Sequence, residues 1–188
     1  MPDDETATLT NAAVLARRVY EAAHLTGTFT LRSGAVSSEY FDKYRFETDP
    51  VLLRDICAAL VPMVPSDVDG LAGLELGGVP IATVLSQLTG LAVFFVRKQA
   101  KSYGTMRIAE GGSLAGRRLL IVEDVVTSGG AILDAAGPLR AEGAVIGPVV
   151  CVIDRQAGGG EKLAADGLTL DPLFTMSQLQ AAAVAVSP

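Results

Sequence analysis

The stretch LLIVEDVVTSGGA, residues 119–131, joins an apolar run, two acids and a turn made of hydroxyl residues and glycine. The apolar run predicts a buried strand, and a helical pattern begins near Ala131. In such a strand-to-helix turn, glycines let the backbone approach a ligand, and N–H groups at the helix N-terminus face an anion. Thr127 and Ser128 add hydroxyl donors. The stretch therefore predicts a cradle for a phosphate group.

Glu123 and Asp124 lie a few residues before this turn, at the end of the apolar strand. Burying a carboxylate is costly unless a partner compensates for it. One interpretation is structural, with the acids paired to Arg117 or Arg118. The other is functional, because carboxylates suit ribose hydroxyls, a developing positive charge, or Mg²⁺ held through water. A phosphate cradle beside two acids favours a ribose 5-phosphate ligand.

Strand-like and helical segments alternate along the rest of the chain, which predicts an α/β fold whose mostly parallel central sheet is flanked by helices. The predicted strands cover residues 70–76, 91–98, 117–126, 145–155 and 168–175. The predicted helices cover residues 11–23 (capped by Thr10), 50–64 (capped by Asp49, with Pro50 first), 79–90, 131–144 (broken near Gly137 and Pro138), 159–167 and 176–185. Residues 27–46 predict a hairpin or two short strands that break at Ser33 and Gly34.

Polar clusters follow four of these strands, at residues 75–78, 97–98, 123–124 and 154–155. Ligands of such sheets bind beyond the carboxyl ends of the strands. The four clusters are therefore expected to meet in one site.

The composition excludes several classes of function. A chain of 188 residues, 49% of them hydrophobic, predicts one domain with a real core, and a net charge of −6 argues against nucleic-acid binding. The acidic N-terminus is no targeting signal, and the apolar runs are too short to span a bilayer. One histidine and two separated cysteines argue against a zinc site and a Ser-His-Asp site. We expect a cytoplasmic protein with no membrane or nucleic-acid partner.

Residues 119–131 resemble the 5-phosphoribosyl 1-diphosphate (PRPP) binding motif of type I phosphoribosyltransferases throughout its length. The resemblance implies the type I phosphoribosyltransferase fold, with a small N-terminal hood. It also implies that Glu123 and Asp124 face the ribose hydroxyls, while residues 125–131 bind PRPP and Thr127–Ala131 hold its 5-phosphate.

Three cations, Arg97, Lys98 and Lys101, open a glycine-bearing segment after a strand. A charge run is usually a solvated face, but long segments of this kind also serve as active-site lids. With Gly104, the run resembles the flexible catalytic loop of orotate phosphoribosyltransferases, in which Tyr103 replaces the usual histidine. Tyr103 can still donate a hydrogen bond to a phosphate oxygen.

Two other segments resemble the same family. Residues 29–44 resemble the hood over the base, with Arg32 in the place of a lysine and with Tyr40 and Phe41 expected to stack on the pyrimidine. Residues 154–163 resemble the segment in which Arg155 would bind the orotate carboxylate. By themselves, the two segments are also consistent with a core hairpin that leaves Arg32 exposed and with an ion pair of Arg155 with Asp154 or Glu161.

The turn Leu76-Gly77-Gly78 resembles the diphosphate loop of that family, many members of which carry lysine where Gly77 stands. The full resemblance covers about residues 29–175. It implies one domain over residues 1–188, with an N-terminal helix and hood in 1–48, an α/β core in 49–188 and a flexible loop at about 99–114.

The implied reaction is transfer of the phosphoribosyl group from PRPP to N1 of orotate, in pyrimidine biosynthesis. It implies a homodimer that shares the loop between subunits, and Mg²⁺ held mainly through PRPP and water, with Asp124 as a candidate ligand. The implied catalytic residues are Lys101, Asp124 and Glu123. The implied PRPP-binding residues are Arg97, Lys98, Lys101, Tyr103, Gly77, Gly78, Glu123, Asp124, Val125, Val126, Thr127, Ser128, Gly129, Gly130 and Ala131. The implied orotate-binding residues are Arg32, Tyr40, Phe41, Thr127 and Arg155.

Two alternatives remain open at this point. One is a phosphoribosyltransferase for another base, which Arg32 and Arg155 argue against because they suit an anionic pyrimidine. The other is a PRPP-binding regulator of transcription, for which the chain has neither spare length nor positive charge.

Overall fold

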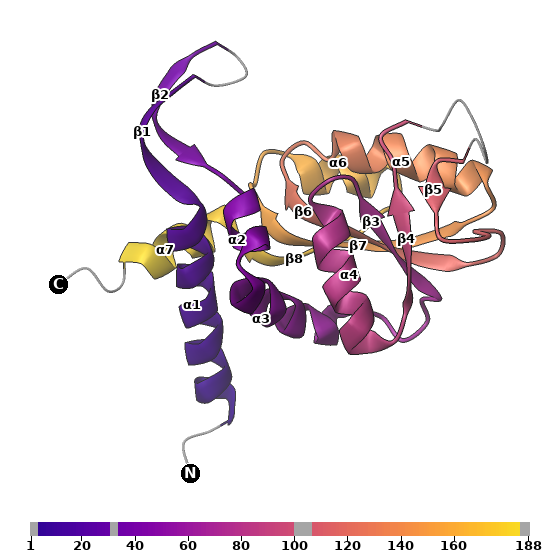
Figure 1. The fold of residues 1–188 in the computed structure, drawn as a ribbon, viewed down its shortest axis with the longest axis horizontal. Coiled ribbons are helices and arrows are strands. Elements are labelled where there is room, and N and C mark those ends of the chain that lie inside the picture. The colour runs from indigo at the N-terminus through magenta and orange to yellow at the C-terminus, as the bar shows by residue number, and fades with distance from the viewer. Residues whose placement is uncertain (1–3, 31–33, 100–106, 185–188) are drawn as a thin grey trace.

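The computed structural model describes residues 4–30, 34–99 and 107–184, with side chains from residue 11 onward. Within these residues, six strands form a central sheet in the order β5-β4-β3-β6-β7-β8, and all of its neighbouring pairs are parallel except β4 with β5 (Figure 1). The strands are β3 (Gly70–Leu74), β4 (Ala92–Val96), β5 (Ala109–Glu110), β6 (Arg118–Val126), β7 (Val145–Asp154) and β8 (Leu170–Thr175). The predicted α/β class is confirmed.

Helices cover both faces of this sheet. They are α1 (Asp4–Ala23), α2 (Tyr44–Thr48), α3 (Pro50–Leu60), α4 (Gly78–Thr89), α5 (Gly130–Ala141), α6 (Gly159–Ala165) and α7 (Met176–Val184), with a 3-10 turn η1 (Val61–Met63) after α3. In the described part of the chain, no helix combines the length and the apolar character needed to cross a membrane.

The alternation of side chains along β6 divides the core in two. Leu120 and Val122 pack in a cluster with residues of α1, α3, α4 and α7. Leu119 and Ile121 pack in a second cluster with residues of α5 and α6. Successive side chains of a strand point to opposite faces, so the central strands are apolar on both.

A hairpin of β1 (His24–Thr30) and β2 (Val36–Phe41) projects away from the central sheet, beyond the end of α1 (Figure 1). Its base is tied to α1 by a hydrogen bond from Asp42 N to Ala23 O of 2.8 Å. The predicted hairpin is confirmed. Residues 31–33, between its two strands, lie outside the described part of the chain.

Two helix predictions were wrong in detail. The first helix begins at Asp4 and runs through Thr10, which is therefore no N-cap. α5 continues through Pro138 to Ala141 without a break. The residue before a proline normally avoids the helical region because its Cβ meets the ring, and Gly137 has no Cβ.

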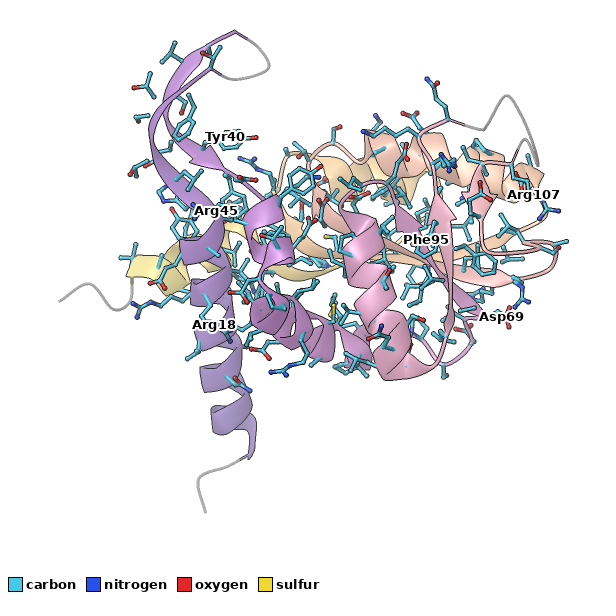
Figure 2. All side chains as sticks on the ribbon, viewed as in Figure 1. Arg18, Tyr40, Arg45, Asp69, Phe95 and Arg107 are labelled. Carbon is cyan, nitrogen blue, oxygen red and sulfur yellow. The ribbon has the colours of Figure 1, made fainter. Side chains whose placement is uncertain are left out.

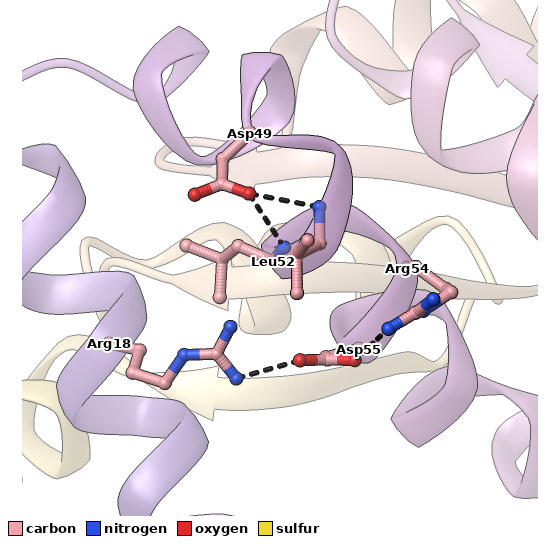
Figure 3. Close-up of polar contacts among 6 residues, drawn as sticks. Arg18, Asp49, Leu52, Arg54 and Asp55 are labelled. Carbon is pink, nitrogen blue, oxygen red and sulfur yellow. Dashed lines mark hydrogen bonds and ion pairs between the residues drawn. The ribbon is translucent and has the colours of Figure 1, made fainter.

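The predicted start of α3 is confirmed. The Asp49 carboxylate accepts hydrogen bonds from the backbone nitrogens of Val51 and Leu52, at 2.9 and 3.0 Å (Figure 3). In the same view, Arg18 of α1 pairs with Asp55 of α3 at 2.7 Å. The cap stabilises the first turn of α3, and the ion pair joins α3 to α1.

We expect Asp49→Ala to lower the stability of the fold at neutral pH, because two helix N–H groups lose their acceptor. Hydrogen bonds from Leu52 and Val51 lower the pKa of Asp49 below its ordinary value of 3.8. The charged cap thus stabilises the fold above that value, and its contribution is lost as the pH falls through the lower folded-state pKa. Urea denaturation of Asp49→Ala and Asp49→Asn between pH 7 and pH 3 measures this. Asn keeps the cap without the charge, so an Asn variant as unstable as the Ala variant would contradict the capping role.

Candidate active site

The carboxyl ends of β3, β4 and β6 meet at one edge of the sheet and border a cleft of about 230 Å³. Its lining residues are Lys43, Tyr44, Glu75, Leu76, Lys98, Glu123, Val125, Val126, Thr127, Ser128, Gly129, Gly130, Ala131 and Ile132. A neighbouring hollow of about 390 Å³ shares Glu75, Lys98, Gly130 and Ala131 and adds Arg97. The predicted polar clusters after β3, β4 and β6 therefore converge. The fourth predicted cluster, at residues 154–155, does not line this cleft, and Asp154 borders a separate depression.

The predicted phosphate cradle is the turn between β6 and α5. Gly129 caps α5 in the left-handed region, with φ of 70°, and a Cβ there would lie 3.1 Å from Leu163 Cγ. Thr127 and Ser128 are exposed at the cleft. The free N–H groups of the first turn of α5 thus open on the cleft together with two hydroxyls, which is an arrangement that binds phosphate.

The turn before α4 forms the opposite wall. Gly78 is buried at the start of α4, where a Cβ would lie 2.2 Å from Val122 O. The peptide between Glu75 and Leu76 is cis. Glu75 Oε1 accepts a hydrogen bond of 2.7 Å from Lys98 N, which connects this turn to the segment after β4.

Glu123 and Asp124 differ in their exposure and in their position relative to the cleft. Glu123 is 8% exposed and lines the cleft, whereas Asp124 is fully buried. Asp124 Oδ1 accepts a hydrogen bond of 2.6 Å from Val125 N, and Oδ2 lies 2.5 Å from Lys43 Nζ. The structure thus pairs Asp124 with a lysine that the sequence did not single out.

The alternative in which Glu123 and Asp124 pair with Arg117 or Arg118 is not observed in the described residues. Arg118 pairs with Asp67 at 3.1 Å, and Arg117 Nε donates to Ser113 O at 3.1 Å. Neither arginine forms an ion pair with Glu123 or Asp124 there.

Glu47 of α2 completes a buried group of three carboxyls around Lys43. Burial, then a hydrogen bond to Asp124, raise the pKa of Glu47 to about 9, and the same two causes raise the pKa of Glu123 well above its usual range. Burial also acts to raise the pKa of Asp124, but hydrogen bonds to Glu123 and Lys43 outweigh it and lower that pKa. These opposite shifts favour the negative charge of the group on Asp124, opposite the Lys43 ammonium.

The predicted loop cations are only partly described. Arg97 Nε lies 3.5 Å from Glu110 Oε1 of β5, and Arg97 N donates to Ile108 O at 2.9 Å. Lys98 borders both hollows. Lys101, Tyr103 and Gly104 lie outside the described residues. The flexible loop was predicted at about residues 99–114. The part of it from residue 107 to residue 114 contains the short strand β5.

The hairpin aromatics lie on opposite faces of β2, as strand alternation requires. Tyr40 is 44% exposed and stacks on Phe29, with ring centroids 5.5 Å apart, and Figure 2 shows it on the projecting hairpin. Phe41 packs against Tyr20 and the core. In the structure, Tyr40 and Phe41 are not placed to stack on the same pyrimidine ring. Arg32 lies outside the described residues.

Arg155 follows β7, and its side chain is exposed. Its backbone nitrogen donates to Val126 O at 2.9 Å, which ties it to the end of β6. In the described structure it forms no ion pair with Asp154 or Glu161, and Asp154 Oδ1 instead accepts from Gln156 N at 2.8 Å. The guanidinium is therefore free to bind a ligand.

A larger depression of about 740 Å³ lies between α6 and β8. Its described lining includes Asp154 and Glu161 and no lysine or arginine. A phosphate ligand is thus favoured in the smaller cleft, where Lys43 and Lys98 stand beside the cradle.

The described residues contain no group of three or more histidine, cysteine or acidic side chains that could hold a metal ion by themselves. Glu123 and Glu75 are the acids that line the cleft, and Glu75 already accepts the hydrogen bond from Lys98 N. This donor set fits Mg²⁺, which commonly keeps several waters and binds through substrate phosphates and one or two carboxylates.

Comparison with known proteins agrees with this geometry. Residues 63–175 match the phosphoribosyl transferase domain family. An orotate phosphoribosyltransferase of Nocardioides sp. is 51% identical over 174 residues, which are 93% of this chain and 97% of that protein. The chain belongs to the orotate phosphoribosyltransferase family.

Solved structures of this family have the same fold. The Mycobacterium tuberculosis H37Rv orotate phosphoribosyltransferase in complex with Fe(III) dicitrate superposes with a TM-score of 0.82 at 31% identity, over 90% of this chain and 98% of that one. The structure of the same enzyme in complex with PRPP gives a TM-score of 0.77 at 28% identity, over 90% and 99% of the two chains.

Several candidate residues were missed from the sequence. Lys43, Tyr44 and Glu75 line the cleft, and Glu47 contacts Asp124. Glu75 belongs to the predicted polar cluster at residues 75–78, but no role of its own was predicted for it. Lys43 and Glu47 belong to no such cluster, because they reach the site through the path of the chain after the hairpin.

Proposed function

We propose that this protein transfers the 5-phosphoribosyl group from PRPP to N1 of orotate, giving orotidine 5′-monophosphate and diphosphate in pyrimidine biosynthesis. The observation that carries the proposal is the cleft in which the β6–α5 cradle and Glu123 lie beside Glu75 and Leu76, the residues that lead into the Gly77-Gly78 turn. In PRPP bound along this cleft, the 5-phosphate would lie at the cradle, the ribose beside Glu123 and the diphosphate near the turn before α4.

In the reaction, the bond between C1 of the ribose and the diphosphate oxygen breaks, and the diphosphate leaves with the electron pair. N1 of orotate forms the new bond to C1 and loses its N–H proton to water. Positive charge develops on the ribose ring. Asp124 behind the cleft supplies the nearby negative potential that stabilises this charge, and Glu123 at the cleft is proposed to bind the ribose hydroxyls. Residues 127–131 hold the 5-phosphate and so fix C1 relative to orotate.

Mg²⁺ bound through PRPP oxygens and water, with Glu123 as its protein partner at the cleft, would neutralise diphosphate charge. Arg97, Lys98 and Lys101 are proposed to bind the diphosphate as it leaves, together with Tyr103 and the backbone of Gly77 and Gly78. Arg155 is proposed to hold the orotate carboxylate, with Arg32, Tyr40 and Thr127 around the base. Phe41 packs against Tyr20 and the core and is left out of this site.

A cytoplasmic homodimer whose subunits share the loop that carries Lys101 is part of the proposal. The projecting hairpin supports a dimer, because Val36 is 71% exposed and Tyr40 44% exposed on it. Large exposed apolar side chains that gather on one projecting element are typical of contact surfaces.

The assay mixes the protein with PRPP, Mg²⁺ and one base at a time and follows the fall in orotate absorbance, or product formation for the other bases. Orotate should react, and adenine, hypoxanthine and xanthine should not. Turnover of a purine in place of orotate would establish the alternative base specificity, and binding of PRPP with no turnover would favour a regulator.

We expect Arg155→Lys to raise the KM for orotate by roughly 10- to 100-fold, because the bidentate contact to the carboxylate is lost and hydrogen bonds to charged groups contribute about 1.5–3 kcal/mol. The KM for PRPP should change little. Steady-state kinetics with each substrate varied in turn measure this.

Arg54→Lys on the exposed face of α3 is the matched control and should leave both KM values unchanged. An orotate KM that stays at the wild-type value in Arg155→Lys would remove Arg155 from the orotate site.

A further inference from the structure

Lys43 stands between β2 and α2, at the end of the segment that resembles the hood, where the resemblance assigns it no role. It borders the cleft with Tyr44, and its ammonium lies 5.2 Å from the centroid of the Tyr44 ring. Its side chain is 34% exposed, whereas its partner Asp124 is fully buried. Lys43 therefore reaches inward from the rim of the cleft to an acid beneath the proposed ribose site.

The Asp124 carboxylate is held at both of its oxygens. Oδ1 accepts from Val125 N at 2.6 Å, and Oδ2 lies 2.5 Å from Lys43 Nζ. Oδ2 also lies against the turn before α4, because a Cβ on Gly77 would come within 1.7 Å of it. The carboxylate thus occupies the space that a side chain at position 77 would need.

Charge makes Lys43 necessary for this placement. A buried carboxylate without a partner is strongly unfavourable, and two further carboxyls, of Glu47 and Glu123, adjoin Asp124. In the described residues, Lys43 is the one cation that forms an ion pair with Asp124. Without it, Asp124 would be expected to turn away from Gly77.

We propose that Lys43 is a positioning residue for phosphoribosyl transfer, which holds the Asp124 carboxylate between the Gly77 turn and the phosphate cradle so that the site accepts PRPP. This inference rests on the proposed PRPP site. Lys43 acts through Asp124 and connects the segment after the hairpin to the middle of the cleft, where the ribose is proposed to lie.

The test compares Lys43→Met, which keeps the length of the stem and removes the charge, with Lys43→Arg, which keeps the charge. We expect Lys43→Met to lower kcat/KM for PRPP by about 10²-fold, the order of loss that follows from a misplaced group in a site. PRPP binding by calorimetry should weaken in parallel, the KM for orotate should change little, and Lys43→Arg should recover a large part of the loss. Lys162→Met, at an exposed lysine of α6, is the matched control.

A double-mutant cycle with Asp124→Asn separates positioning from a general effect on folding. Because Asn carries no charge, Lys43→Met should cost little further PRPP affinity in that background, and the double variant should fold even if Lys43→Met alone does not. An equal loss of PRPP affinity in both backgrounds would overturn the proposal, and so would a Lys43→Met variant that folds and binds PRPP as the wild type does. A wild-type protein that binds PRPP without turnover would contradict the proposed reaction and leave this binding test intact.

Discussion

Gly78→Ala is expected to abolish most of the activity and to lower the stability of the fold. The new Cβ would lie 2.2 Å from Val122 O, which is a backbone atom of the central strand β6. Neither group can rotate away, so α4 and its preceding turn must shift relative to β6. Overpacking of this kind costs about 1–3 kcal/mol. A shift of about 1 Å at the diphosphate turn would cost about 10²-fold in rate. Thermal unfolding and steady-state kinetics of the same preparation measure both effects.

Gly160→Ala provides the control for a glycine at a helix start. Its Cβ would have as nearest neighbour Leu170 Cδ2, at 3.9 Å, which is ordinary contact. Its unfolding midpoint should equal or slightly exceed that of the wild type, because alanine favours a helix. A Gly78→Ala variant with wild-type stability and turnover would show that the close approach of α4 to β6 is not required.

The elements with strong local signals were predictable. Asp49 followed by Pro50 fixed the start of α3, and Gly90, with φ of 77°, ends α4 where the pattern places it. Apolar strands alternating with helices give a parallel sheet because each strand must be covered on both faces. The position of the cleft followed from these signals, since the ends of parallel strands share one edge.

The different orientations of the two acids were missed from the sequence, although the rule that governs them is local. Leu120, Val122 and Asp124 fall on one face of β6, and Ile121 and Glu123 fall on the other. Two adjacent residues of a regular strand therefore cannot face one ligand in the same way. The structure follows this rule, with Glu123 at the cleft and Asp124 beside α2 and α4.

The pairing of Lys43 with Asp124 could not be predicted, because it joins residues far apart in the sequence that share no element. No periodicity or spacing connects them. Only the tertiary path, in which the hairpin leads into α2 near the carboxyl ends of β3 and β6, brings them together. Pairing of β5 with β4 is similar, since a strand of two residues has too little pattern to detect.

Lys101→Ala is expected to reduce kcat by about 10²- to 10³-fold, the loss that follows removal of one preorganised donor to a developing charge. The residue lies outside the described structure, and the expectation rests on its place in the loop motif after Arg97 and Lys98. Diphosphate gains charge only as the bond to C1 breaks, so a cation that binds the leaving group stabilises the transition state more than bound PRPP. PRPP binding by calorimetry should therefore survive while turnover is lost. Lys162→Ala, on the exposed face of α6, should keep wild-type turnover.

Mixing two inactive variants tests whether the loop crosses to the neighbouring subunit. In a hybrid dimer of Lys101→Ala and Asp124→Asn, a shared loop would place the intact Lys101 of one subunit over the intact acids of the other. One complete site would form, and activity should rise above that of either variant alone. A loop that serves its own subunit would leave every site in the hybrid with one defect, so the mixture would stay inactive. Unchanged turnover of Lys101→Ala would instead remove Lys101 from the mechanism, and the charge on the leaving diphosphate would then fall to Arg97 and Lys98 at the edge of the cleft.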